Sequence, residues 1–349
     1  MTSIFIFISG ATLLVYSAER LISSLVGISR GLAISVFLLA IIFTGIEFDD
    51  IVLGIALNLE GDQDVALGLV IGTAVSFSGI VLAIGAILAP TSFQVPREYI
   101  VVFALSPLIM LVFAIRKEVT TVDAIVLLLL FVAWIAYVAV HESRRETATF
   151  RNLEIIEEAE ELEEEGEGQS QPSDPIRTQA VDTMSVFKRQ GRWSAWLNLG
   201  LAAVAICGII IGAATVSTGT DQILSRYSIE GTVFGATIVT AVLSIEDLFL
   251  TARPIRRGVP EIGIGNVIGS LIFSVTGKLG IVVLAGGSVA IGSSVLHWHL
   301  PVLLGLTGLS AYFLWTGELK RWHGFVLLGL YIAYWVVSFV VYGGAPVDD

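Results

Sequence analysis

The chain has 349 residues, of which 55% are hydrophobic and 14% charged, and its mean hydropathy is +0.86. Soluble domains carry about 25% charged residues, so this composition excludes a water-soluble fold and indicates a polytopic protein in a lipid bilayer. The net charge of −12 argues against a nucleic-acid partner. The single cysteine, Cys207, excludes an intrachain disulfide and a thiolate metal cluster.

A helix that spans a membrane needs about 20 mostly apolar residues, and the sequence offers about ten candidate stretches. In chain order they are 3–25, 31–58, 65–92, 98–115, 121–141, 194–217, 229–252, 262–286, 299–317 and 323–343. The first stretch lacks a basic leader and a small-residue cleavage site, so we interpret it as a membrane helix rather than a cleaved signal. The predicted fold class is an all-α polytopic membrane protein.

The positive charges predict the orientation of these spans. Ten spans place both termini on one side, and the loops of the opposite side hold fourteen Lys and Arg residues against three on the terminal side. Loops rich in Lys and Arg face the cytoplasm. We therefore expect a protein of the cell membrane with both termini outside and the long middle loop in the cytoplasm.

The middle loop, residues 144–193, is strongly acidic. Its stretch from Glu154 to Glu167 holds nine glutamates and no cation. A solvated, largely disordered linker explains this composition. The alternative is a regulatory site for divalent cations, although no Asp, Asn and Gly spacing of a binding loop supports it.

The two halves of the chain repeat each other. A shift of 197 residues aligns Asp49-Asp50 with Glu246-Asp247 without a gap. Each copy holds five spans, an odd number, so the second copy enters the membrane inverted relative to the first. Such inverted repeats are typical of secondary transporters, whose binding site lies between the repeats near the midplane. The predicted units are a first repeat at 1–143, the acidic loop at 144–193 and a second repeat at 194–349.

Five acidic residues lie inside expected spans, where each ionised carboxylate costs about 3 kcal/mol or more unless it is compensated. They are Glu47, Asp49 and Asp50 in the stretch 31–58, and Glu246 and Asp247 in the stretch 229–252. Acids near a helix end that reach water are the alternative. Nine uncharged residues separate Asp50 from Glu60, which disfavours this alternative. We therefore expect these acids to have a functional role.

The spacing of the acids predicts an ion-binding site. Glu47 and Asp50 share one helix face, as do Ser244 and Asp247. Carboxylate oxygens are hard ligands that suit Ca²⁺, Mg²⁺, Na⁺ or H⁺, so we predict metal binding by Asp50, Asp247 and Glu47. The further candidate ion ligands are Asp49, Glu246, Ser244, Thr73, Ser270 and Ser274.

Two glycine pairs align in the repeat, and each is followed by a hydroxyl residue. Gly68 and Gly72 precede Thr73, and the second copy has the same arrangement before Ser270. Small residues at this spacing let helices approach closely, which explains the glycines by packing alone. The hydroxyls are candidate ion ligands, although Ser and Thr are also common in membrane helices.

Lys278 lies deep inside the stretch 262–286, where the first repeat has Val81. A lysine in hydrocarbon needs a counter-charge, and the candidates are Glu47 and the acidic pair Glu246-Asp247. A lysine that extends to the membrane surface is the alternative, which the depth of the span disfavours. We hypothesise that Lys278 compensates the acids and that its ammonium replaces one bound cation.

The second repeat contains the motif Gly265-Asn-Val-Ile-Gly269-Ser270, which begins eighteen positions after Asp247. The spacing is the same in the first repeat, where Gly68 lies eighteen positions after Asp50. In these features, and in the opening stretch Ser9–Val15, the sequence resembles the calcium/cation antiporter superfamily, which includes the sodium/calcium exchangers. Members carry two inverted repeats, each with a Gly-Thr-Ser-Leu-Pro-Glu signature followed by Gly-Asn-x-x-Gly-Ser-Asn. The resemblance covers both halves apart from the acidic loop.

The resemblance places the family's ion-binding glutamates on Asp50 and Asp247, each one methylene shorter. The family's proline becomes Asp49 and Glu246, so we expect both helices to continue without the family's break. The family's threonine positions fall on Ile46 and Leu243, and its serine positions fall on Glu47 and Ser244. Its Gly-Asn and Ser-Asn pairs become Gly68-Leu69 and Thr73-Ala74 in the first repeat, and its further polar position falls on Phe77 and Ser274. These departures leave the identity of the ions open.

The expected function is secondary active antiport, in which Ca²⁺ or another cation is exchanged for Na⁺ or H⁺ by alternating access. Inorganic cations are then substrates, no cofactor is expected, and a monomer suffices. A proton-coupled or non-calcium exchanger, a transport-deficient sensor and a passive channel are alternatives. An intramembrane aspartyl hydrolase requires an acid after Gly-x-Gly, and Gly263-Ile264-Gly265 is followed by Asn266, so we expect no enzyme.

Overall fold

The computed structural model describes residues 2–29, 47–143, 193–256 and 260–343. These parts of the chain are mostly helical, and they include four strands of two residues each. The expected linker at 144–193 lies outside the described residues except for its last one. The first part of the span expected at 31–58 also lies outside them, up to residue 46.

The first half of the chain contains the elements α1 (Thr2–Ser29), α3 (Phe48–Glu60), α4 (Gln63–Ser76), η1 (Phe77–Val81), α5 (Leu82–Leu88), β1 (Thr91–Ser92), α6 (Arg97–Ile115), β2 (Glu118–Val119) and α7 (Thr121–Ser143). The elements labelled η are π-helical turns. Gly61 ends α3 with a φ of 101°, a left-handed conformation that glycine adopts without strain.

The second half contains α10 (Trp193–Tyr227), α11 (Gly231–Phe234), η3 (Gly235–Val239), α12 (Thr240–Leu243), α13 (Ile245–Arg256), α14 (Pro260–Phe273), η4 (Ser274–Lys278), α15 (Leu279–Gly286), β3 (Val289–Ala290), η5 (Val295–His299), α16 (Leu300–Trp315), β4 (Glu318–Leu319) and α17 (Arg321–Val341). The turns η1 and η4 begin at Phe77 and Ser274, which are 197 residues apart, the offset of the sequence repeat. A π-helical turn often marks a functional site.

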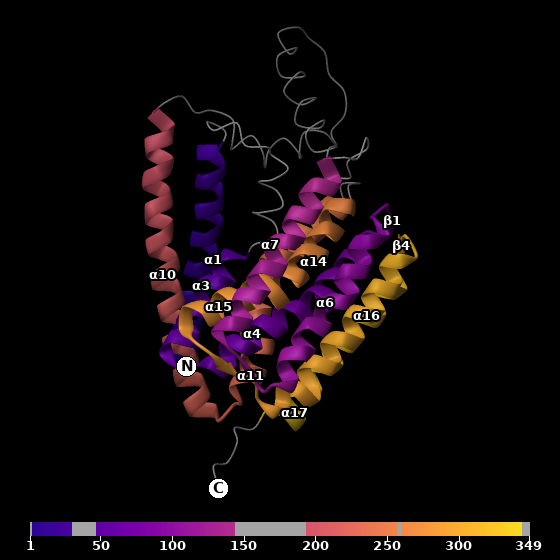
Figure 1. Ribbon diagram of the computed structural model, residues 1–349. Helices are drawn as coiled ribbons and strands as arrows, with labels where there is room; N and C mark the ends of the chain where they lie inside the picture. Colours follow the sequence, from indigo (N-terminus) through magenta and orange to yellow (C-terminus); the bar gives the residue numbers. More distant parts are fainter. Residues whose placement is uncertain (1, 30–46, 144–192, 257–259, 344–349) are drawn as a thin grey trace.

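Six helices of the described chain are long and apolar enough to cross a membrane, and a seventh is added if a bent helix pair counts as one span. The expectation of an all-α polytopic membrane protein is confirmed. The count of ten spans and the inverted repeat stay predictions. The described end of α7 and the start of α10 lie at one end of the bundle, and α1 begins at the opposite end (Figure 1).

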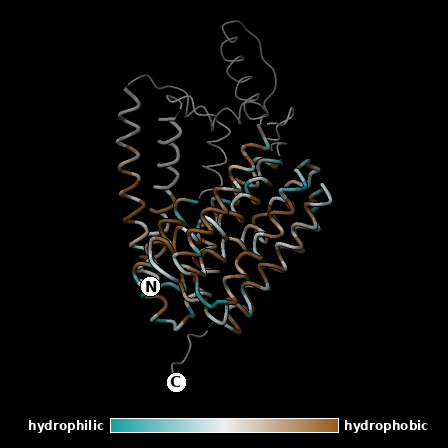
Figure 2. The backbone as a smooth tube through the Cα atoms, in the orientation of Figure 1, coloured by the Kyte–Doolittle hydropathy of each residue, from teal (hydrophilic) through white to brown (hydrophobic). Residues whose placement is uncertain are grey.

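Burial separates central helices from peripheral ones. The most apolar 18 residues are 89% buried in the span Gln63–Leu88 and 83% buried in the span Gly263–Gly286. The corresponding values are only 17% in Thr121–His141 and 28% in Arg321–Val341. Figure 2 shows that the peripheral helices are nevertheless strongly hydrophobic along their length. Exposed apolar surface of this extent fits lipid rather than water, so the outer helices face the bilayer and the central two form the core.

Contacts between the two halves hold the bundle together. The strand β1 pairs antiparallel with β4, and β2 pairs antiparallel with β3, so each short ladder joins one half to the other. α1 packs along α10 at one edge of the bundle (Figure 1). A Cβ added to Gly10 would lie 2.8 Å from the backbone nitrogen of Val216, so glycine permits this close approach.

Candidate ion-binding site

The acids of the first half lie at the start of a helix. α3 begins at Phe48, and Glu47 has non-helical backbone angles, φ −78° and ψ 89°. Asp49 and Asp50 therefore occupy the first turn, where unpaired N–H groups and the helix dipole favour negative charge. The broken backbone thus creates a local environment that stabilises buried carboxylates.

The second half is broken at the equivalent place. α12 ends at Leu243, Ser244 forms a turn, and α13 begins at Ile245, so Asp247 also lies in a first helical turn. The segments Gly231–Leu243 and Asp247–Arg256 are bent by 56° relative to each other. The expectation of a helix that continues without a break was wrong for the second half, whereas in the first half the residues before Glu47 lie outside the described part of the chain. The break persists without proline because carboxylates beside the new N-terminus stabilise the free N–H groups.

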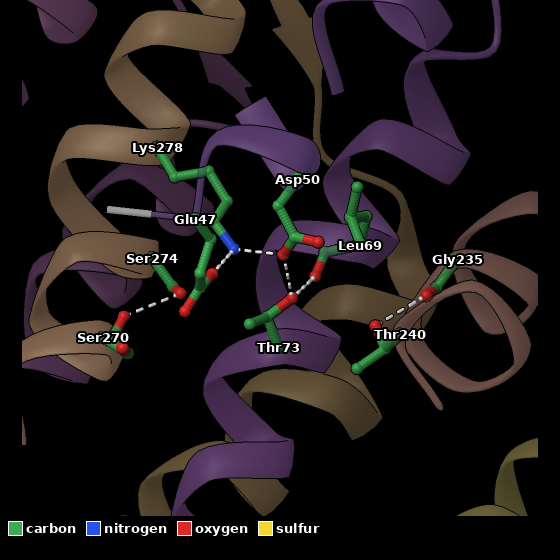
Figure 3. Close-up of polar contacts among 9 residues, drawn as sticks. All are labelled: Glu47, Asp50, Leu69, Thr73, Gly235, Thr240, Ser270, Ser274 and Lys278. Atoms are coloured by element: carbon green, nitrogen blue, oxygen red, sulfur yellow. Dashed lines mark hydrogen bonds and ion pairs between the residues drawn. The ribbon is translucent and has the colours of Figure 1, made fainter. Parts of the chain in front are cut away.

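Lys278 connects the two halves of the site. It is the last residue of η4, its side chain is fully buried, and its ammonium forms ion pairs with Glu47 and Asp50 (Figure 3). The ammonium donates to Glu47 Oε2 and to Asp50 Oδ2. The counter-charges of this lysine therefore come from the first half of the chain.

Thr73 completes the surroundings of Asp50. Its hydroxyl oxygen lies 2.8 Å from Asp50 Oδ2 and 2.8 Å from the carbonyl oxygen of Leu69 (Figure 3). The same Asp50 oxygen contacts the ammonium of Lys278. Asp50 Oδ2 is thus shared by the Thr73 hydroxyl and the Lys278 ammonium. The hydrogen bond to the charged ammonium is the stronger kind, and the neutral hydroxyl adds to it.

The acids of the second half have different surroundings. Asp247 is buried, with 8% of its surface exposed, and it forms no hydrogen bond or ion pair with the residues that the structure describes. Ser270 and Ser274 are fully buried, and the Ser274 hydroxyl donates to the Ser270 carbonyl oxygen at 2.8 Å (Figure 3). Asp247 lies within electrostatic range of Glu47, Asp49, Asp50 and Lys278.

The remaining predicted ligands are placed less fully. Asp49 and Ser244 are buried, with 8% and 3% of their surfaces exposed. The side chain of Glu246 lies outside the described part of the chain. In that part, no group of three or more His, Cys, Asp or Glu side chains is arranged to hold a metal ion. Metal binding by Asp50, Asp247 and Glu47 together therefore stays a prediction.

The first glycine pair serves helix packing. A Cβ on Gly68 would lie 2.3 Å from the Thr232 carbonyl oxygen, and a Cβ on Gly72 would lie 2.5 Å from Ala236 Cα. α4 therefore packs directly against α11 and η3. Gly269, the repeat equivalent of Gly72, has no atom within 4 Å of an added Cβ, so the two pairs are not equivalent in packing.

Two polar contacts next to the site were not predicted from the sequence. Asn58 Nδ2 donates to the Val282 carbonyl oxygen at 2.9 Å and joins α3 to α15. Asn266 Nδ2 donates to Thr251 Oγ1 at 3.2 Å and joins α14 to α13. An amide inside an apolar span costs free energy without a partner, so Asn58 itself was the signal that could have identified the first contact.

A bundle of apolar helices that buries acids and a lysine at helix breaks near its centre defines the class of membrane transporters. The chain belongs to the sodium/calcium exchanger protein family, because a model of that family matches residues 2–140 and 197–340. The expected membership is thereby confirmed, and it supports cation antiport.

Individual relatives are similar over different lengths. The sodium/calcium exchanger MaX1 of Methanosarcina acetivorans is 32% identical over 139 residues, which are 40% of this chain and 39% of that protein. The putative antiporter CaxA of Alkalimonas amylolytica is 23% identical over 97% of this chain and 99% of its own. The structure of the sodium-calcium exchanger NCX_Mj soaked with Na⁺ and Ca²⁺ is similar with a TM-score of 0.58 and 20% identity, covering 98% and 99% of the two chains, which shows a shared fold.

Proposed function

We propose that this protein is a secondary active antiporter that exchanges Ca²⁺ or another inorganic cation for Na⁺ or H⁺. The observation that carries the proposal is the group of buried carboxylates in the first turns of two helices, α3 in the first half of the chain and α13 in the second. Broken helices with ionisable side chains at their ends are typical of ion sites in secondary transporters. The names of the relatives MaX1 and NCX_Mj favour Na⁺ and Ca²⁺ as the first ions to test.

The proposed ion ligands are the carboxylates of Asp50, Asp247, Glu47, Asp49 and Glu246 with the hydroxyls of Ser244, Thr73, Ser270 and Ser274. Oxygen ligands can replace the hydration shell of a hard cation, and competing cations then exclude each other from one charge-balanced site. Alternating access requires a part of the molecule that moves. We propose that α1 and α10, which pack along each other at the edge of the bundle, move together against the core.

The arrangement in the membrane is also a proposal. We place both termini outside the cell, the loop 144–193 in the cytoplasm, and one inverted repeat on each side of that loop, at 1–143 and 194–349. The family match at 2–140 and 197–340, which leaves out the loop, supports these units. The equal offset of η1 and η4 supports the repeat.

A second candidate function is sensing without transport. The ion pairs of Lys278 with Glu47 and Asp50 favour it, because a lysine that never leaves the acids would keep part of the site closed to ions. The two functions differ in one measurement, which is flux.

Reconstitution of the purified chain into proteoliposomes tests the proposal. Uptake of Ca²⁺, Mg²⁺ and K⁺ is measured under an imposed Na⁺ gradient and then under an imposed H⁺ gradient. Antiport predicts uptake of one cation only when the other is present on the opposite side. Uptake without a counter-ion indicates a channel, and specific cation binding without any flux indicates a sensor.

A further inference from the structure

Lys278 breaks the equivalence of the two halves at the site. It ends η4, and Val81 ends η1 at the same position of the sequence repeat. The Lys278 side chain is fully buried and reaches from the second half to Glu47 and Asp50 of the first half. A cationic side chain is thus inserted at one of two otherwise matched positions.

The oxygens around the ammonium are of the kind that bind a cation. Glu47 Oε2 and Asp50 Oδ2 accept from Lys278, and the hydroxyl of Thr73 lies 2.8 Å from the same Asp50 oxygen. Figure 3 shows Glu47 and Asp50 reaching the nitrogen of Lys278, with Thr73 on the other side of Asp50. A mobile cation cannot occupy this position together with the ammonium, because two like charges in a buried site repel strongly.

The second half offers oxygens that no ammonium occupies. Asp247 is the repeat equivalent of Asp50, and Ser270 is the equivalent of Thr73. The Ser270 hydroxyl is buried and makes no hydrogen bond within the described chain. Asn266 on α14 contacts Thr251 on α13. Ser270 lies one helical turn after Asn266, and Asp247 lies one helical turn before Thr251. The next turn away from this contact therefore brings Ser270 level with Asp247.

We propose that Lys278 is a tethered cation that occupies the proposed ligands of the first half, Glu47, Asp50 and Thr73. This narrows the ligands of the transported cation to the second half, where Asp247 and Ser270 hold it. This inference rests on the proposed cation antiport and specifies its stoichiometry. If the two halves were equivalent, each would bind a cation from solution. In this protein the Lys278 ammonium supplies one of these positive charges, and it never crosses the membrane. The exchange cycle therefore moves one positive charge fewer than the same site without the lysine.

The test measures charge per cycle in Lys278→Met, which removes the ammonium and keeps an unbranched apolar side chain. Proteoliposomes of the full chain are clamped at set membrane potentials, with the pair among Na⁺, H⁺, Ca²⁺, Mg²⁺ and K⁺ that gives flux in the wild type. We expect the reversal potential of Lys278→Met to shift by the equivalent of one elementary charge per cycle, and Lys278→Arg to keep the wild-type value. An unshifted reversal potential in an active Lys278→Met protein overturns the inference.

A second variant decides the case in which Lys278→Met is inactive or misfolded. Lys278→Met combined with Glu47→Gln removes one positive and one negative charge together, so it restores the net charge of the site. We expect this protein to fold, as judged by a monodisperse gel-filtration peak, and to exchange cations more slowly than the wild type, because Glu47 is a proposed ligand, but with the wild-type charge ratio. A changed ratio, a complete loss of exchange or a failure to fold overturns the inference. Absence of flux in the wild type contradicts the proposed antiport instead, so the two failures are distinguishable.

Discussion

At the scale of single residues, Asp50 and Asp247 carry the charge of the proposed site. We expect Asp50→Asn and Asp247→Asn each to lower cation exchange at least about 100-fold, because loss of one partner in a buried charge pair costs about 3 kcal/mol or more. In Asp247→Asn the cation loses its carboxylate directly, whereas in Asp50→Asn Lys278 loses one of its two acceptors. Cation uptake into proteoliposomes measures both effects.

A matched control is Glu118→Gln, which neutralises an exposed acid at the edge of β2. This variant should transport at the wild-type rate and elute from gel filtration as the wild type does. Wild-type flux in Asp50→Asn or in Asp247→Asn contradicts the assignment of that residue to the site.

The carboxyl group of Asp62 should make the free energy of unfolding depend on pH. It lies between α3 and α4, and partial burial, followed by the hydrogen bond and charge of Asp221 and the charges of Glu60 and Asp64, raises the pKa of Asp62 from 3.8 to about 7. The folded state then keeps a proton that the unfolded state releases near its ordinary pKa. The free energy of unfolding therefore falls as the pH rises from about 4 to 7, and this contribution is lost above about pH 7.

Asp62→Asn removes this dependence, because the amide stays neutral at every pH. Above pH 7 we expect the variant to be more stable than the wild type by about 1 kcal/mol, a small value because solvent screens a half-exposed carboxylate. Below pH 4 the two proteins should melt alike. Thermal unfolding in detergent at pH 4 to 8 measures the difference, and parallel curves at all pH values contradict the assigned pKa.

The sequence identified the acids of the site but not their backbone. Carboxylates stand out in an apolar span because each one is visible in the sequence and costs free energy inside a membrane whatever the rest of the fold. The break before Asp247 was not predicted, since the expected signal was a proline and none is present there. Charge narrowed the expected partners of Lys278 to Glu47 and the pair Glu246-Asp247. The structure confirms Glu47 and adds Asp50, which was not expected because its contact depends on how distant helices pack.

At the scale of elements, α4 is held against α11 and η3 by glycine. Gly72→Ala places a methyl group 2.4 Å from Thr240 Oγ1 and 2.5 Å from Ala236 Cα, so the helices must separate. Overpacking of this kind costs about 1–3 kcal/mol. We expect a correspondingly lower midpoint of thermal unfolding.

The repeat provides the control for this prediction. Gly269→Ala changes the equivalent residue of the second half, where an added Cβ meets no atom within 4 Å. It should melt as the wild type does, or slightly higher because alanine favours a helix. Equal destabilisation by both substitutions would show that the glycines act through backbone conformation rather than through packing.

Helices were predictable as elements because long apolar stretches require them in a bilayer, and the expected range 98–115 differs from α6 (Arg97–Ile115) by one residue. The π-helical turns were not predictable. Phe77–Val81 and Ser274–Lys278 differ from the neighbouring helix by one extra residue per turn, which leaves no mark on hydrophobic periodicity. The turn matters because it ends at Lys278.

At the scale of the whole molecule, the proposed alternating access moves α1 and α10 against the helices that hold the acids. Asp62, at the junction of α3 and α4, lies close enough to Asp221, near the end of α10, for the Asp221 carboxylate to raise the pKa of Asp62. The contact therefore links the proposed moving pair to the core. In a background that lacks Cys207, the double variant Asp62→Cys and Asp221→Cys should form a disulfide on oxidation and stop exchange. Reduction with dithiothreitol should restore it.

The control places a disulfide between two core elements. Ser92 and Glu318 are register partners in the ladder of β1 and β4, which joins the two halves without involving α1 or α10. Oxidation of Ser92→Cys with Glu318→Cys should leave exchange unchanged if the core moves as one body. Because both disulfides join neighbouring side chains, a difference between them reports which parts move rather than a general effect of cross-linking. Exchange that persists with the Asp62–Asp221 pair fully oxidised would mean that α10 stays fixed to α3 throughout the cycle, and that the moving part lies elsewhere in the bundle.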